Sequence, residues 1–335
     1  MKSKIAGLAL ALFMSSSPML DAQGGYSYAT VNVPDRGNFD QGIATGISDS
    51  GQVALQDFAD NQGYVRNTDG TFTVVNPGRF VSFPTGISSD GKVVGYTIDS
   101  SSGGFQGFVR SADGGSFDRF QAPDGGPTRA FGVNSSGVVV GQSTTSFLRS
   151  ADGQTYTAIH DPAAQITSTF ALGINDRGQV VGYYSAPNGS EHIFVRSADG
   201  SSYSTVDIPG AVAYLGGTGL TGSLGINDSG QIAGEYRDVL GNDHGFVRDA
   251  DGTIRELNVP GGNTTEVYGI NNLGQVVGAA VPSEGISREI RGFIATPGAT
   301  AVPEPGSLLM LGMGLAGAAG YRWRRAGRSS GSRVC

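Results

Sequence analysis

Short apolar runs alternate with turn residues through the middle of the chain, and the alternation repeats. Each repeat has Gly, a branched apolar residue, a four-residue turn rich in Asn, Asp and Ser that ends in Gly, and a β-branched strand. The six copies are GISDSGQVAL from Gly46, GISSDGKVVG from Gly86, GVNSSGVVVG from Gly132, GINDRGQVVG from Gly173, GINDSGQIAG from Gly225 and GINNLGQVVG from Gly269. Their starts lie 40, 46, 41, 52 and 44 residues apart, which predicts repeated four-stranded units.

The second half of each unit predicts two further strands. The third strand carries an aromatic residue, then a branched residue and, in five units, Arg, as in Phe108-Val109-Arg110. Asp-Gly turns follow and predict hairpins. The fourth strand ends in Pro in five units, which is tolerated at the edge of a sheet. These prolines are Pro77, Pro123, Pro162, Pro209 and Pro260.

The sixth unit lacks a fourth strand of its own, and a spare copy of that strand lies near the N-terminus. Residues 27–34 read SYATVNVP, and residues 202–209 read SYSTVDIP. We expect the N-terminal strand to complete the sixth unit and close a ring. The predicted fold class is therefore all-β, a six-bladed β-propeller over residues 26–298. The alternative is an open β-solenoid, which would need distinct caps at its ends.

The two ends of the chain are predicted to be targeting segments. Residues 1–22 have a basic start, an apolar run and a polar end, the layout of a secretory signal peptide. Residues 301–328 contain Val302-Pro303-Glu304-Pro305, an apolar stretch and the basic residues Arg322, Arg324 and Arg325. This order predicts a short transmembrane helix, with its Arg cluster in the cytoplasm and the body outside. A plain C-terminal anchor is the alternative.

The C-terminal tail resembles the PEP-CTERM sorting tails of Gram-negative bacteria in its order of Pro-Glu-Pro, apolar helix and Arg cluster. This resemblance implies recognition by an exosortase and removal of the tail after transient anchoring in the inner membrane. It also implies release or attachment at the cell surface or in the extracellular matrix.

The repeats resemble the HAF family of bacterial extracellular repeat proteins. The signature positions read His192-Ile193-Phe194 and His244-Gly245-Phe246, and other units have Gln, Thr or Arg in place of His. The family implies no catalytic activity that could be carried over to this chain. Exchange of His for Gln indicates a polar hydrogen-bonding position beside the aromatic residue.

Composition narrows the function classes. Without the first 22 residues and those after Pro305, 15 basic and 28 acidic residues remain, a net charge of −13. Such a body is not expected to bind nucleic acid, which requires a basic surface. The single cysteine, Cys335, excludes a disulfide framework and a thiolate metal cluster.

The candidate ligand contacts are five Arg residues at equivalent repeat positions, which a propeller would arrange around its axis. They are Arg66, Arg110, Arg149, Arg196 and Arg248. They could bind an anionic polymer, or each could pair with a turn carboxylate such as Asp69 or Asp113. Calcium is disfavoured, because the loop that starts at Asp249 has Pro260 where a calcium loop needs Glu.

We predict no catalytic residue, metal site or cofactor. The leading hypothesis is a non-enzymatic surface or matrix protein that associates with exopolysaccharide. The insertion at residues 210–222, which lengthens the fourth interval, is the first candidate for a contact surface. The alternatives are a carbohydrate-active propeller enzyme with paired carboxylates and a protein-binding scaffold in the envelope.

Overall fold

The structure, a computed structural model, consists of β-strands throughout its described part. It describes residues 20–23, 25–31, 33, 41–78, 81–98, 104–164, 169–214, 224–282 and 290–298. The chain divides into two compact units, Met1–Pro297 and Gly298–Cys335, and beyond Gly298 the second unit lies outside the described residues. Most of the predicted signal peptide and all of the predicted sorting tail lie outside them too.

Within those residues, no helix is both long and apolar enough to cross a membrane.

Each repeat contributes an inner strand that precedes its Asn-rich turn and a second strand that follows it. The inner strands are β3 (Gln41–Ile47), β7 (Val81–Ile87), β11 (Arg129–Val133), β15 (Thr169–Ile174), β20 (Leu224–Ile226) and β24 (Gly262–Ile270). The second strands are β4 (Val53–Asp57), β8 (Val93–Ile98), β12 (Val139–Gln142), β16 (Val180–Ser185), β21 (Ile232–Asp238) and β25 (Val276–Pro282). In the fifth repeat, β19 (Ala211–Tyr214) also pairs with β21.

Third and fourth strands complete the units. The third strands are β5 (Gln62–Arg66), β9 (Phe105–Arg110), β13 (Ser146–Arg149), β17 (Glu191–Arg196), β22 (Asp243–Arg248) and β26 (Ile290–Pro297). The fourth strands are β6 (Phe72–Val75), β10 (Phe117–Phe120), β14 (Tyr156–Ile159), β18 (Tyr203–Val206) and β23 (Ile254–Leu257). As predicted, a proline follows each fourth strand within three residues, where it removes no hydrogen bond from the ladder.

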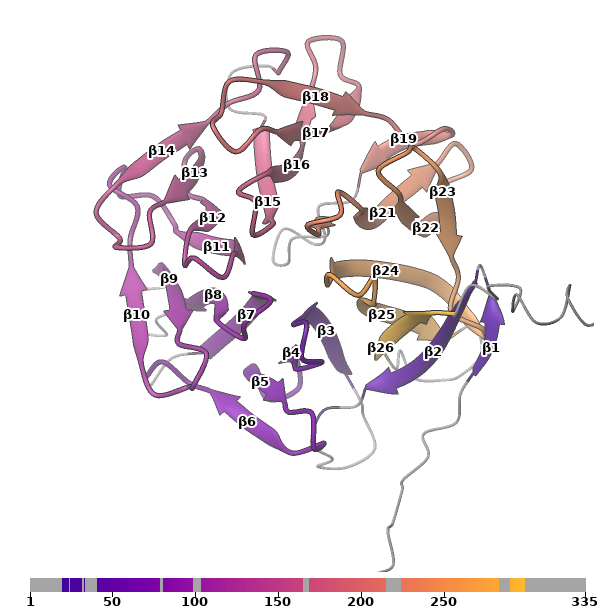
Figure 1. Ribbon diagram of the computed structural model, residues 1–335, viewed down its shortest axis with the longest axis horizontal. Helices are drawn as coiled ribbons and strands as arrows, with labels where there is room; N and C mark the ends of the chain where they lie inside the picture. The colour runs from indigo at the N-terminus through magenta and orange to yellow at the C-terminus, as the bar shows by residue number, and fades with distance from the viewer. Residues whose placement is uncertain are drawn as a thin grey trace, which may run out of the picture. The chain divides into compact units, whose positions relative to one another are not determined.

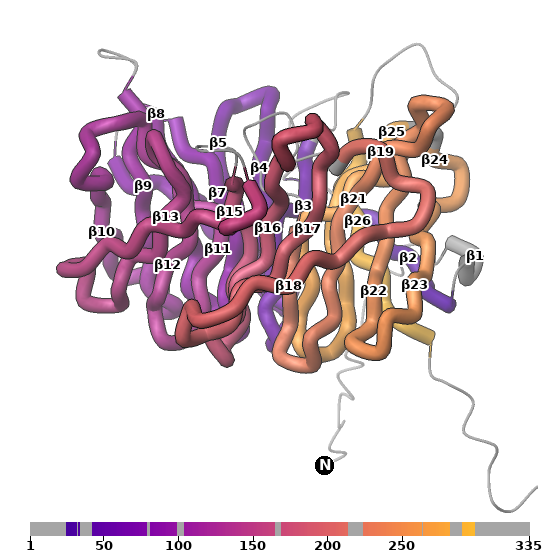
Figure 2. The backbone as a smooth tube through the Cα atoms, turned by 90° about the horizontal axis from the view of Figure 1, so that it is seen from above, coloured from indigo at the N-terminus to yellow at the C-terminus, as the bar shows by residue number. Residues whose placement is uncertain are grey.

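The sheets are antiparallel and stand around a common centre, with the fourth strands at the periphery (Figure 1). The second, third and fourth repeats each form a separate four-stranded sheet. The first and sixth repeats are joined in one nine-stranded sheet by a short parallel pairing of β26 with β3, at Ile290↔Gln41 and Arg291↔Gly42. The side view in Figure 2 shows the strands of successive repeats standing side by side.

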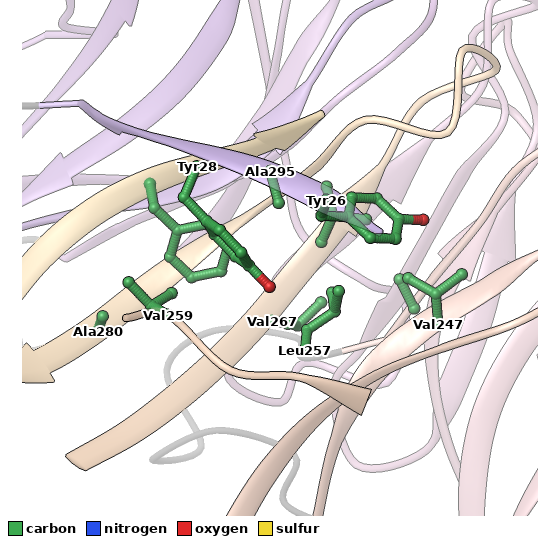
Figure 3. Close-up of a cluster of buried hydrophobic side chains, with 11 residues drawn as sticks. Tyr26, Tyr28, Val247, Leu257, Val259, Val267, Ala280 and Ala295 are labelled. Carbon is green, nitrogen blue, oxygen red and sulfur yellow. The ribbon is translucent and has the colours of Figure 1, made fainter. Parts of the chain in front are cut away.

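The N-terminal strand closes the last repeat. Strand β2 (Tyr26–Val31) pairs with β26 over six residue pairs, from Tyr26↔Pro297 to Val31↔Gly292, so the predicted pairing of the chain's two ends is confirmed. Tyr26 and Tyr28 are 1% and 0% exposed, and they pack into an apolar cluster between the fifth and sixth repeats (Figure 3). A further strand, β1 (Leu20–Gln23), pairs with the outer edge of β2.

Glycine in the inner strands allows neighbouring repeats to pack backbone against backbone. A Cβ on Gly173 would lie 2.6 Å from the carbonyl oxygen of Leu224 in the next repeat, and one on Gly86 would lie 2.6 Å from that of Phe131. A Cβ on Gly269, in the sixth repeat, would meet Gly46 of the first at 3.2 Å. The six inner strands therefore contact one another in a closed circle, and each contact requires a missing side chain.

Candidate functional site

The six Asn-rich turns converge at the centre of the ring, around a cavity of about 50 Å³. Each turn ends in a Gly with φ between 74° and 96°, a conformation that glycine adopts without a steric penalty. The first polar residue of every turn is buried. These residues are Ser48, Ser88, Asn134, Asn175, Asn227 and Asn271.

Buried amides connect one turn to the next. The Nδ2 of Asn175 donates to the carbonyl oxygen of Asn227, the Nδ2 of Asn227 to that of Asn271, and the Nδ2 of Asn271 to that of Ser48, each at 3.0 Å. Asn134 makes the same bond to Asn175 at 3.4 Å. Since a buried polar group without a partner costs about 1–3 kcal/mol, these amides favour the assembled ring.

The remaining two links use other groups and complete the circle. The backbone N–H of Asp49 donates to the carbonyl oxygen of Ser89 at 3.2 Å. The ammonium of Lys92, in the second repeat, donates to the carbonyl oxygen of Ser135 in the third at 2.9 Å. All six turns are thereby hydrogen-bonded to their neighbours, and we call this set of bonds the central turn ring.

Three carboxylates of the central turn ring line the same cavity, and each accepts hydrogen bonds from other turns. Asp176 accepts from the backbone N–H of Ser135 at 2.6 Å and from the hydroxyl of Ser89 at 2.5 Å. Asp49 accepts from two nitrogens of Asn272, both at 2.9 Å, and Asp228 accepts from the backbone N–H of Asp176 at 2.9 Å. Through these hydrogen bonds, the three carboxylates hold the turns together.

A second central cavity, of about 60 Å³, is lined by the inner-strand glycines and by apolar side chains. The branched residue that precedes each turn borders both cavities. These six are Ile47, Ile87, Val133, Ile174, Ile226 and Ile270. Sites for drug-sized ligands usually enclose about 300–1,000 Å³. Both cavities are therefore too small for a sugar ring, and they suit a few water molecules.

Four of the five predicted Arg contacts lie against the Asp-Gly turns of their own repeats, near Gly114, Gly153, Gly200 and Gly252. Arg110, Arg149 and Arg196 are only 6–8% exposed, whereas Arg66 and Arg248 are half-buried. Their burial favours the structural alternative at the three positions, and direct contact with a polymer stays a prediction for the other two.

Arg149 shows how such a side chain joins two repeats. Its guanidinium donates to Asp118 at 2.6 Å and lies 4.4 Å from the centre of the Phe120 ring. Both partners are on β10, the fourth strand of the preceding repeat. Burial lowers the pKa of Arg110, and the charge of Asp113 opposes that effect. Pairing of each Arg with a turn carboxylate of its own repeat stays a prediction.

The two signature histidines lie in hydrogen-bonded stacks near the surface. The ring of His192 lies 5.3 Å from that of Tyr184, and its nitrogens contact the carboxylate of Asp207 at 2.8 Å and the hydroxyl of Ser190 at 2.7 Å. The sequence predicted a polar hydrogen-bonding position here, and that prediction is confirmed.

His244 repeats this arrangement in the next unit. Its ring lies 5.1 Å from that of Tyr236, and its nitrogens contact Glu256 at 2.9 Å and Asp238 at 3.1 Å. The signal that sequence reasoning missed is a tyrosine eight residues before each histidine, which becomes its cross-strand partner. Sequence reasoning also missed that the turn residues would face the ring centre.

His244 is expected to make stability depend on pH. Burial acts to lower its pKa, but hydrogen bonds to Asp238 and Glu256 outweigh it and raise the pKa above 6.5. The imidazolium therefore stabilises the fold below pH 6.5, and this contribution is lost as pH rises through the raised value. We expect His244→Gln to lower the free energy of unfolding by a few tenths to about 1 kcal/mol at pH 5, and by less at pH 8. Urea unfolding at both pH values measures this, and an equal loss at both would contradict it.

Among the described side chains, no group of three His, Cys, Asp or Glu residues could hold a metal ion. The insertion at residues 210–222 lies mostly outside the described part, although its start forms β19. Near it, Val239 and Leu240 are 77% and 82% exposed at the tip of the β21–β22 hairpin.

Comparison with known proteins identifies the tail and the fold. Residues 301–325 match the PEP-CTERM protein-sorting motif, and this range contains all seven predicted sorting residues. The motif is a sorting signal that exosortase recognises, and it marks exported, surface-directed proteins of Gram-negative bacteria. None of the curated proteins matches the chain in sequence.

Several solved structures resemble the ring. A putative TolB from Agrobacterium tumefaciens is 13% identical, with a TM-score of 0.52 over 65% of this chain and 80% of its own. The gluconolactonase XC5397 from Xanthomonas campestris is 11% identical, with a TM-score of 0.52 over 82% and 90%. These are β-propeller proteins, and at such low identity the likeness shows a propeller-like, all-β fold alone.

Proposed function

We propose that the chain is an exosortase-sorted, non-enzymatic protein that displays a six-bladed propeller of HAF-type repeats on the cell surface or in the matrix, where it associates with exopolysaccharide. The observation that carries the proposal is the PEP-CTERM motif at residues 301–325, which begins within a few residues of the last strand. Two observations support six blades: the contacts between the six inner strands and the pairing of β2 with β26.

The structural role of the polar centre supports a non-enzymatic function. The carboxylates of the central turn ring hold neighbouring turns together, and the cavity they line is about 50 Å³. Exopolysaccharide is expected to bind on the outside of such a ring, because the cavities at its centre are too small to enclose a sugar ring.

We expect the sorting motif to decide where the protein goes. Replacing Pro303, Glu304 and Pro305 together by Ala removes the motif's first part, so the variant should stay in the inner-membrane fraction while the wild-type chain reaches the surface or medium. Immunoblots of cell fractions from a Gram-negative host with an exosortase should show at least a ~10-fold change in this ratio.

Arg333→Ala lies beyond the matched residues and serves as the control, with unchanged sorting expected. Surface delivery of the triple variant at the wild-type level would indicate sorting by another signal. Digestion of the extracellular polysaccharide should then release the sorted wild-type protein into the supernatant. Retention after digestion would contradict the polymer association and favour a protein-binding scaffold.

A carbohydrate-active enzyme is the second candidate function, because Asp49, Asp176 and Asp228 line one mouth and glycoside hydrolysis needs two carboxylates. Release of reducing ends from a polysaccharide by the purified protein, lost in Asp176→Asn, would establish this activity in place of the non-enzymatic one.

A further inference from the structure

Two neighbouring repeats carry the same Tyr–His pair, in which the imidazole is partly exposed. Tyr184 lies opposite His192 across β16 and β17, and Tyr236 lies opposite His244 across β21 and β22. The ring planes are 30° and 21° apart, so the imidazole of His244 stacks on Tyr236 and that of His192 is tilted over Tyr184. In the first and second repeats the corresponding pairs are Asp57 with Gln62 and Thr97 with Gln106, which offer no flat surface.

Each imidazole is held in place by hydrogen bonds and is partly exposed to solvent. Both ring nitrogens of each histidine are hydrogen-bonded, which fixes the orientation of the ring. His192 and His244 are 26% and 22% exposed. Part of each imidazole is therefore available for contact with a ligand.

Carboxylates border both platforms. Asp207 beside His192 is 57% exposed, and Glu256 beside His244 is 45% exposed. Each uses one oxygen for the imidazole and retains acceptor capacity on the other for an external hydroxyl. We call Tyr184, His192 and Asp207 the first Tyr–His module, and Tyr236, His244 and Glu256 the second.

We propose that the two Tyr–His modules are subsites for pyranose units of an uncharged, hydroxyl-rich polysaccharide. The C–H groups on one face of a pyranose pack on an aromatic face, and the sugar hydroxyls donate to Asp207 and Glu256. The same carboxylates repel uronates and phosphates, as does the acidic body. The inference rests on the proposed function and names its binding site and ligand class.

The repetition of the module fits a polymer better than a single sugar. The two modules occupy equivalent positions in adjacent repeats, on the part of the ring formed by β16–β18 and β21–β23 (Figure 1). One such shallow site binds weakly, but a chain that contacts both gains affinity because the second contact is intramolecular. A polymer is therefore expected to bind much more tightly than its monosaccharide.

Histidine-to-glutamine variants test the assignment at pH 8, where their effect on stability is expected to be small. The first and second repeats already carry Gln at this position, Gln62 and Gln106, so His192→Gln and His244→Gln keep a polar side chain and remove only the platform. Native gel electrophoresis in gels that contain dextran, soluble starch or a β-glucan measures binding, with alginate as the anionic comparison. Gln62→Ala is the matched control at an equivalent position whose cross-strand partner, Asp57, is not aromatic.

We expect retardation of the wild-type protein by at least one uncharged polymer and none by alginate. Each single variant should bind about ten-fold more weakly, and the double variant should show no retardation, while Gln62→Ala binds as the wild type. Binding that persists in the double variant would overturn the site and leave the polymer association standing. Binding to alginate alone, or to no polymer, would overturn the ligand class, and the digestion experiment on cells would then decide the association separately.

Discussion

Removal of the N-terminal strand is expected to unfold the ring. A chain without residues 20–33 lacks β2, and with it Tyr26 and Tyr28, which are almost fully buried in the sixth repeat. Loss of one large buried aromatic side chain costs about 3–5 kcal/mol, and domains are stable by only about 5–15 kcal/mol. Circular dichroism and thermal unfolding should show a loss of the cooperative transition.

The control is a chain that lacks only residues 20–23, which removes β1 and leaves the pairing of β2 with β26 intact. This chain should keep most of the wild-type stability. A synthetic peptide of residues 25–34, added to the larger deletion, should restore the transition in a concentration-dependent manner. Cooperative unfolding of the chain without residues 20–33 at the wild-type temperature would show that the ring is stable without β2.

A single methyl group on an inner-strand glycine should also destabilise the ring. In Gly173→Ala, the new Cβ would lie 2.6 Å from the backbone oxygen of Leu224, and a backbone atom in a closed circle of strands has little freedom to move away. Overpacking of this kind costs about 1–3 kcal/mol. Adding Gly86→Ala, which meets the oxygen of Phe131 at 2.6 Å, should roughly double the loss.

Gly115→Ala is the matched control, because its Cβ would meet nothing closer than 3.5 Å and the site is exposed. Its effect on the free energy of unfolding should stay within about 0.5 kcal/mol. Urea unfolding of the three variants provides the comparison. If Gly173→Ala is as stable as the control, then neighbouring inner strands are not in backbone contact.

The sequence predicted the strands and the pairing of β2 with β26, because both can be recognised from local, repeated patterns. In the fourth repeat, local sequence alone predicts the turn at Asn175, the strand that begins at Val180 and the end of β18 before its proline. The match between residues 27–34 and 202–209 then identified the partner of β26. The parallel pairing of β26 with β3 had no such signal, since it depends on how closely two repeats approach.

The candidate sites were harder to predict because they depend on which way a side chain points. Equivalent positions indicated a ring of Arg residues, but strand twist and turn packing bury Arg149 between repeats. The Asn residues were interpreted as turn formers, although their amides also bond to the next repeat. The Tyr–His modules appear only when the register of β16 with β17 places position 184 opposite position 192.

The pairing of β2 with β26 sets an order of events during export. A chain that crosses the membrane N-terminus first carries β2 through about 260 residues of translocation before its partner emerges. The unpaired strand is an exposed edge throughout that interval and could pair with other chains. Ring closure is therefore a late, long-range event that slows folding. Because β26 lies just before the sorting motif, the partner of β2 is the last strand of the repeats to be exported.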